Sequence, residues 1–208
     1  EGGLGKTHTV INSLKRVGLK DITEMVADAD AGTTIQRNKN FVVIKGFSTA
    51  KGLFKLLYEN KDSIVVFDDC DSILKDPDAL NLLKGALDSY DKRFISWNTN
   101  SVDDNLPRTF QFTGGVVFIS NLTQDKISQA LRSRSMCIDL SMTTDQKIDR
   151  MEHILKEANF LPSVSSIQKF DAFEFLKVNK DIAKEINLRT LINITKIRTD
   201  GGSNWKDL

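Results

Sequence analysis

The chain has 208 residues, of which 40% are hydrophobic and 27% are charged, a composition typical of globular proteins. This length accommodates one α/β domain and a small second unit. The formal net charge of +1 gives no global attraction to nucleic acid or membrane, so binding to either would need a local patch. Two cysteines and two histidines argue against a disulfide framework and against a zinc site. No apolar run is long enough to span a membrane and no signal peptide is visible, so we expect no membrane partner and a cytoplasmic protein, in host cytoplasm if the protein is viral.

The first residues, E-G-G-L-G-K-T, match the end of the phosphate-binding pattern G-x-x-x-x-G-K-[ST]. Glycines let backbone N–H groups surround phosphate oxygens, Lys6 adds a positive charge, and the Thr7 hydroxyl is a magnesium ligand. A helix predicted over residues 7–17 would point its amino end at the same phosphates. The residues predicted to contact nucleotide are Gly2, Gly3, Leu4, Gly5, Lys6, Thr7 and His8. The first glycine of the pattern would precede Glu1, and such a loop follows a buried strand, so we expect an upstream segment that supplies both.

Beyond this motif, short β-branched runs alternate with helical patterns, which predicts βαβ units and a parallel sheet. In chain order we expect a strand at 41–45, a helix at 50–60, a strand at 64–67, a helix at 77–90, and strands at 116–119 and 136–140. After residue 142 the pattern becomes helical, with helices predicted at 144–158, 167–178 and 180–198. The sequence therefore predicts an α/β domain over residues 1–142 and a small all-helical domain over residues 143–208.

Paired acids follow the predicted strand I-V-V-F, at Asp68 and Asp69. Ligands of open α/β sheets bind at the carboxyl ends of the strands, where these carboxylates would lie. In phosphate-loop NTPases an acid at this place holds magnesium and a second acid orients the attacking water. An acidic turn is the alternative for an isolated Asp pair, but the G-K-T motif upstream favours the metal site.

Two weaker signals come later in the chain. Asn121 follows the predicted strand 116–119 and could position a water or a phosphate oxygen, although Asn is also common in turns. Arg132 and Arg134 precede the predicted strand 136–140. Arginines at a helix end usually lie on a solvated surface, so their place in the order of motifs is the more informative feature.

This order of motifs resembles that of AAA+ ATPases over nearly the whole chain, with a looser resemblance to bacteriophage members. The resemblance implies that Gly3, Gly5, Lys6 and Thr7 form the Walker A loop. It further implies that Asp68 and Asp69 form Walker B, with Asp68 and Thr7 serving Mg²⁺ and Asp69 orienting water, and that Asn121 is sensor 1.

The same resemblance implies contributions from other parts of the family's assembly. Arg134 corresponds to the arginine finger that reaches a neighbouring subunit's nucleotide, with Arg132 as the fallback, and Arg189 corresponds to sensor 2. The implied activity is hydrolysis of Mg-ATP at subunit interfaces of a homo-oligomer, most often a hexameric ring, to remodel or translocate a protein or nucleic-acid substrate.

Two departures from the family pattern, the unseen first Walker A glycine and the second Walker B acid, leave alternatives open. The second Walker B acid is Asp69, where the family usually has the longer Glu, so turnover could be slow. A low-turnover ATP-dependent switch or loader that oligomerises on a partner is therefore an alternative. The string G-G-x-G-K-T is also similar to partitioning ATPases of the ParA and MinD type, but their signature lysine would stand at Glu1.

Two segments are candidates for contact with the substrate polymer. Phe47 lies between the predicted strand 41–45 and the next helix, where AAA+ remodellers carry an aromatic pore-loop residue; packing of Phe47 under its own loop is equally compatible with the sequence. The segment 92–98, K-R-F-I-S-W-N, mixes basic and aromatic residues that could bind nucleic acid, as could Arg108. A hairpin that packs against a neighbouring subunit is the alternative that we favour there.

Overall fold

The computed structural model describes residues 2–3, 5–27, 40–46, 49–98 and 106–207. The chain divides into two compact units, an α/β unit over Lys6–Asp139 and a helical unit formed by Leu140–Leu208 together with Glu1–Gly5.

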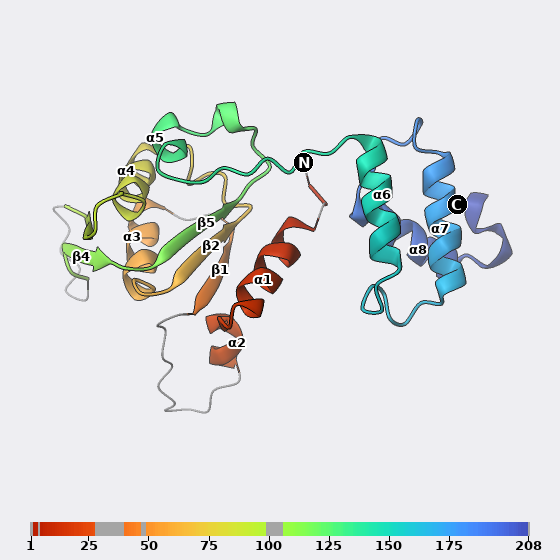
Figure 1. Ribbon diagram of the computed structural model, residues 1–208, viewed down its shortest axis with the longest axis horizontal. Coiled ribbons are helices and arrows are strands. Elements are labelled where there is room, and N and C mark those ends of the chain that lie inside the picture. The colour runs from red at the N-terminus through yellow and green to blue at the C-terminus, as the bar shows by residue number, and fades with distance from the viewer. Residues whose placement is uncertain (1, 4, 28–39, 47–48, 99–105, 208) are drawn as a thin grey trace. The chain divides into compact units, whose positions relative to one another are not determined.

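The α/β unit is built on a parallel sheet of three strands in the order β1-β2-β5. Helices connect and flank the strands, as Figure 1 shows. Five predicted elements are confirmed, with bounds α1 Lys6–Arg16, β1 Phe41–Lys45, α3 Ala50–Glu59, β2 Ile64–Asp68 and β5 Gly115–Ile119. The further elements of this unit are α2 Ile22–Ala27, α4 Pro77–Ala86, β3 Arg93–Ser96, β4 Thr109–Phe112, a 3₁₀ turn at Gln124–Lys126 and α5 Gln129–Arg132.

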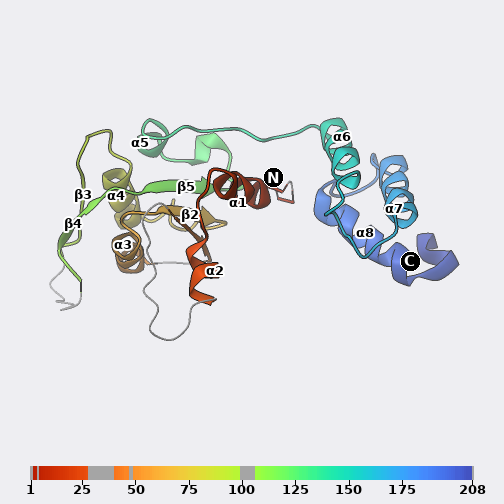
Figure 2. The same ribbon diagram turned by 60° about the horizontal axis from the view of Figure 1, so that its bottom comes forward.

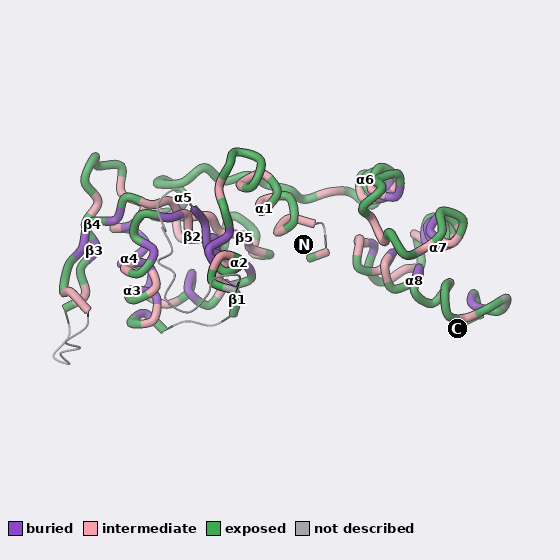
Figure 3. The backbone as a smooth tube through the Cα atoms, turned by 90° about the horizontal axis from the view of Figure 1, so that it is seen from below, coloured by how far each residue is buried: buried purple, intermediate pink, exposed green. Residues whose placement is uncertain are grey.

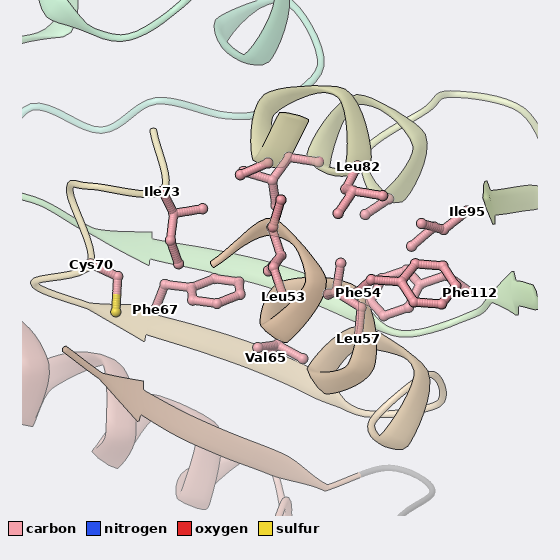
Figure 4. Close-up of a cluster of buried hydrophobic side chains, with 14 of the residues drawn as sticks. Leu53, Phe54, Leu57, Val65, Phe67, Cys70, Ile73, Leu82, Ile95 and Phe112 are labelled. Atoms are coloured by element: carbon pink, nitrogen blue, oxygen red, sulfur yellow. The ribbon is translucent and has the colours of Figure 1, made fainter. Parts of the chain in front are cut away.

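Helices cover both faces of this sheet. Val65 and Phe67 of β2 pack against α3 and α4 in the larger core, where Leu53, Phe54 and Leu82 meet them (Figure 4). Val66, which lies between them in sequence, belongs to a second core with Phe41 and Ile119, on which α1 packs. Within the α/β unit, Figure 3 shows buried positions on the strands and on α3 and α4. Burial of β2 on both faces accounts for its continuous apolar run.

The two helices on the larger core, α3 and α4, each begin after a residue whose side chain caps the helix. The hydroxyl of Thr49 accepts a hydrogen bond from Gly52 N at 3.1 Å and begins α3. Asp76 caps α4 by accepting from Ala79 N at 2.9 Å, and Pro77 occupies the first helical position. The helix predicted over 77–90 ends earlier, at Ala86, with Leu87 as its C-cap. The Arg93 guanidinium donates to Ala86 O at 2.8 Å, one of the carbonyls that a helix end leaves without a partner.

The segment 92–98 enters an antiparallel hairpin of β3 and β4. Because β4 leads through a short turn into the start of β5, the hairpin lies at the amino end of that strand, and Figure 2 shows β5 running from it toward α1. Arg93 is held internally, since it also donates to Gly114 O at 2.6 Å and lies 5.2 Å from the Phe112 ring centroid. Trp97 packs against Phe54. These contacts hold Arg93 and Trp97 within the α/β unit, whereas Phe94 of the same segment is exposed.

The strand predicted at 136–140 is wrong. These residues form no β-ladder in the described part of the chain, and β5 is paired there only with β2. Met136 and Ile138 are 89% and 72% exposed. Alternating apolar residues favour an extended strand, but a strand also needs a neighbour to satisfy its N–H and C=O groups.

The helical unit contains α6 Thr144–Leu155, α7 Ser166–Val178, α8 Leu188–Asp200 and a 3₁₀ segment at Gly202–Asp207. Thr143 and Ser165 begin α6 and α7 with capping boxes. Met151, Phe173 and Leu191 meet in the core of the unit. The first two helix predictions are confirmed, but the helix predicted over 180–198 begins only at Leu188. Across the described ranges, the helices fall short of the length and apolar character needed to cross a membrane.

Candidate functional site

The candidate site lies where α1 begins, at the carboxyl ends of β2 and β5. Lys6 and Thr7 are the first residues of α1, Asp68 ends β2, and Asn121 follows β5 closely. Parallel pairing of β2 and β5 brings their carboxyl ends to one edge of the sheet. The structure therefore brings together the Lys-Thr pair, the acid pair and the asparagine that the sequence analysis selected from separate parts of the chain.

Lys6, Asn121 and Asp69 form a continuous hydrogen-bonded chain. The Lys6 ammonium donates to Asn121 Oδ1 at 2.8 Å and to Ser120 O at 2.7 Å. Asn121 Nδ2 in turn donates to Asp69 Oδ1 at 2.9 Å. The Asn121 amide thus links Lys6 to Asp69. The orientation of this amide follows from its two partners, because its oxygen has to face the ammonium and its nitrogen the carboxylate.

Thr7 and Asp68 form a second contact at the same edge. The Thr7 hydroxyl donates to Asp68 Oδ1 at 2.8 Å, and Lys45 Nζ lies 3.2 Å from Asp68 Oδ2. A hydroxyl and a carboxylate side by side are the hard oxygen donors that Mg²⁺ prefers, and Mg²⁺ usually takes only one or two carboxylates from the protein. The pair fits a magnesium ion in this respect. Among the described residues, no group of three or more His, Cys, Asp or Glu could hold a metal ion.

Asp69 has a left-handed backbone, with φ of 55°. Its amide N donates to Ile119 O at 3.1 Å, which continues the β2–β5 contact by one residue beyond the strand. Asp and Asn accept this conformation more readily than most residues. The turn directs Asp69 to Asn121, while Asp68 remains in the strand and meets Thr7.

Asp71 and Ser120 support this arrangement. Ser120 Oγ donates to Asp71 Oδ1 at 2.5 Å and accepts from Leu122 N at 2.9 Å. These bonds fix the turn that carries Asn121, so Asp71 serves as a positioning group here. Cys70 is buried beneath the turn, and burial raises the pKa of its thiol above the ordinary value.

Lys45 and the Asp71–Ser120 bond were missed by the sequence analysis. Lys45 is the last residue of the predicted strand 41–45, and parallel pairing of β1 with β2 sets it opposite Asp68. Placing Lys45 opposite Asp68 requires knowing that β1 pairs with β2 and in which register, and no local sequence pattern gives that register. The Asp71–Ser120 bond joins two turns far apart in sequence, and no local pattern signals it.

The glycine-rich segment contacts the start of α8 within the helical unit. Leu188 N donates to Gly3 O at 3.0 Å. Gly3 has φ of 73°, and a Cβ added to it would lie 2.8 Å from Asn187 Cγ. Asn187 is also the N-cap of α8, accepting from Thr190 N at 2.9 Å. Arg189, the second residue of α8, is exposed.

The remaining glycines of the segment differ in their backbone. Gly5 has φ of 75°, a left-handed conformation that favours glycine. Gly2 has open space around its Cα, with nothing within 4 Å of an added Cβ. Leu4, also predicted to contact nucleotide, and the pore-loop candidate Phe47 lie outside the described residues.

The other predicted residues lie apart from this network of bonds. His8 is exposed on α1, where its ring meets the Asn12 amide. Arg134 follows α5 and donates to Ala130 O at 3.0 Å, so it caps its own helix, and Arg132 is likewise exposed. A groove of about 660 Å³ lies between α2, β1 and α3, and its lining includes none of the residues of the candidate site.

Comparisons with known proteins give one informative match. The chain is 27% identical, over 99% of its length, to a protein of Enterobacteria phage T4 described as an uncharacterized 36.7 kDa protein of the nrdC–mobD intergenic region. It spans 64% of that relative's length, less than two thirds. Neither a family model nor a solved structure matched. These results place a similar protein in a bacteriophage and leave the activity to the chemistry of the site.

Proposed function

We propose that this protein is an ATPase of the AAA+ type, with Mg-ATP bound where α1 meets the carboxyl ends of β2 and β5. The observation that carries the proposal is the joint placement of Lys6–Asn121 and Thr7–Asp68, at 2.8 Å each, at one edge of a parallel sheet. A lysine charge, a hydroxyl and a carboxylate are groups that hold a metal-bound triphosphate, and a glycine-rich run directly precedes Lys6 in the sequence.

Each side chain has a role that follows from its contacts. Lys6 would turn from Asn121 to phosphate oxygens, and Thr7 and Asp68 would hold Mg²⁺, which neutralises charge on the phosphates when bound. Asp69 would then orient a water and accept its proton, while Asn121 remains beside it as a donor. The Asp71–Ser120 bond keeps that asparagine in place.

The resemblance to AAA+ proteins supports roles for the arginines, assembly into a ring and action on a polymer substrate. Arg134 would act on the nucleotide of a neighbouring subunit, with Arg132 as the fallback, and the resemblance gives Arg189 the sensor 2 role. The protein would assemble as a homo-oligomeric ring, most often hexameric in that family, and act on a protein or nucleic-acid substrate. The match to a phage protein supports an origin in a virus, and the host cytoplasm as its place of action.

The activity is tested by steady-state phosphate release from Mg-ATP. We expect turnover that requires Mg²⁺, that is lost in Asp69→Asn, and that rises with either DNA or an unfolded polypeptide. Stimulation by one of these polymers would identify the substrate class. Absence of hydrolysis under all of these conditions, with nucleotide bound, would overturn the ATPase assignment.

A low-turnover switch or loader is the second candidate. It is favoured by the shorter carboxylate of Asp69, which is already engaged at 2.9 Å by Asn121. The steady-state rate of ATP hydrolysis distinguishes the two functions. A switch would oligomerise on ATP without hydrolysing it at an appreciable rate, with or without a polymer.

A further inference from the structure

Lys45 faces the candidate metal ligand Asp68 from the neighbouring strand. The two residues are register partners at the carboxyl ends of β1 and β2, and Lys45 Nζ lies 3.2 Å from Asp68 Oδ2. Their side chains differ in exposure, at 67% for Lys45 and 6% for Asp68. The pair therefore joins a buried carboxylate to a cation that is largely in water.

The two oxygens of Asp68 have separate partners. Oδ1 accepts from the Thr7 hydroxyl at 2.8 Å, and Oδ2 faces the ammonium of Lys45. A buried carboxylate needs such compensation, because removing a charge from water without a partner is costly. Lys45 has no other ion-pair partner among the described residues, and its exposed side chain can return to solvent at small cost.

We propose that Lys45 is a built-in counter-ion of Asp68 that a divalent cation has to displace, so that Lys45 weakens metal binding at this site. This rests on the proposed function only in taking Asp68 and Thr7 as the metal ligands. A divalent cation on Asp68 and an ammonium beside the same carboxylate repel each other, so the two compete for Oδ2. Lys45 holds Oδ2 of Asp68 in place without metal and leaves it when metal binds.

The test is the affinity of Mn²⁺, measured by electron paramagnetic resonance, for protein saturated with a non-hydrolysable ATP analogue. The variant is Lys45→Met, which keeps the aliphatic stem and removes the charge. We expect Mn²⁺ to bind about two- to fivefold more tightly, the range for losing one partner of a partly exposed ion pair. Lys45→Arg should bind as the wild type does. Lys55→Met removes an exposed lysine that pairs with Glu59 on α3, and serves as the matched control with no expected change.

A double-mutant cycle with Asp68→Asn isolates the contact. In the Asp68→Asn background, Lys45→Met should leave the remaining Mn²⁺ affinity unchanged, because the carboxylate charge is gone. The same gain in both backgrounds would overturn the proposal, as would equal or weaker Mn²⁺ binding by Lys45→Met alone.

Folding and the proposed function are separated by further outcomes. If Lys45→Met is unstable without metal, added Mn²⁺ should restore its thermal unfolding temperature, which supports the counter-ion role. A variant that stays unfolded with Mn²⁺ would show a structural role and contradict the proposal. If the wild type binds neither the analogue nor Mn²⁺, the proposed function fails; if it binds both and Lys45→Met is no different, only the Lys45 proposal fails.

Discussion

Asp69→Asn separates nucleotide binding from hydrolysis with little structural disturbance. Asn accepts the left-handed backbone at φ of 55° as readily as Asp does, and its amide oxygen can still accept from Asn121 Nδ2, now 2.9 Å from the carboxylate. What is lost is the charge and the capacity to take a proton. Weakening of this one hydrogen bond should lower the free energy of unfolding by about 1 kcal/mol or less.

Asp69→Ala provides the structural comparison. Alanine in the left-handed region costs about 1–2 kcal/mol, and loss of the hydrogen bond adds about 1 kcal/mol. The expected order of stability, measured by denaturant unfolding, is therefore wild type, then Asp69→Asn, then Asp69→Ala. A stable Asp69→Asn variant makes its kinetic result interpretable.

Phosphate release should fall by about 10²–10⁴-fold in Asp69→Asn, the usual contribution of a general base. ATP affinity, measured with a fluorescent analogue, should stay at the wild-type level, and the variant should accumulate as a nucleotide-loaded oligomer. Hydrolysis at the wild-type rate would refute the role of Asp69. Asp71 would then be the next candidate, although its carboxylate is occupied by the Ser120 hydroxyl.

Two further predictions concern Arg134 and Gly3. Arg134→Ala should bind ATP normally and hydrolyse it about 10³–10⁵-fold more slowly, and mixing it with Lys6→Ala should restore some turnover through shared interfaces; activity independent of protein concentration in a monomer would exclude this. Gly3→Ala should lower the free energy of unfolding of the helical unit by about 1–3 kcal/mol, because its backbone is left-handed and the new Cβ would meet the N-cap Asn187. Gly2→Ala, with open space around it, is the control, and equal stability of the two variants would argue against the contact with α8.

The strands and helices that could be predicted from sequence are those with a local signal. The apolar run before Asp68 fits burial on both faces, and β2 is indeed covered by α3 and α4 on one side and α1 on the other. The helices predicted from residues 50 and 77 do start there, where the side chains of Thr49 and Asp76 cap α3 and α4.

The errors arose where structure depends on distant partners. The pattern of residues 136–140 favours a strand, yet strand formation depends on a neighbouring edge that the pattern does not contain. The helix predicted from residue 180 instead starts after Asn187, whose side chain caps α8 and packs on Gly3. That contact joins residues from opposite ends of the chain.

The candidate site was only partly accessible from sequence. The acid pair and Asn121 could be selected because each follows an apolar strand of a parallel sheet, whose carboxyl ends share one edge. Lys45 carried no motif, since its role depends on the register of β1 against β2. The bond between Asp71 and Ser120 depends on two turns that meet only in the fold.

Nucleotide binding itself tests the central claim most directly, by calorimetric titration of the wild type and of Lys6→Ala with Mg-ATP. Lys15→Ala is the control, since Lys15 lies on the same helix and pairs with Glu24 away from the site. We expect the wild type and Lys15→Ala to bind alike, and Lys6→Ala to lose about 10- to 100-fold or more in affinity, as for loss of a charged hydrogen-bond donor. Equal affinity in Lys6→Ala, or no binding by the wild type, would contradict a phosphate site at the start of α1.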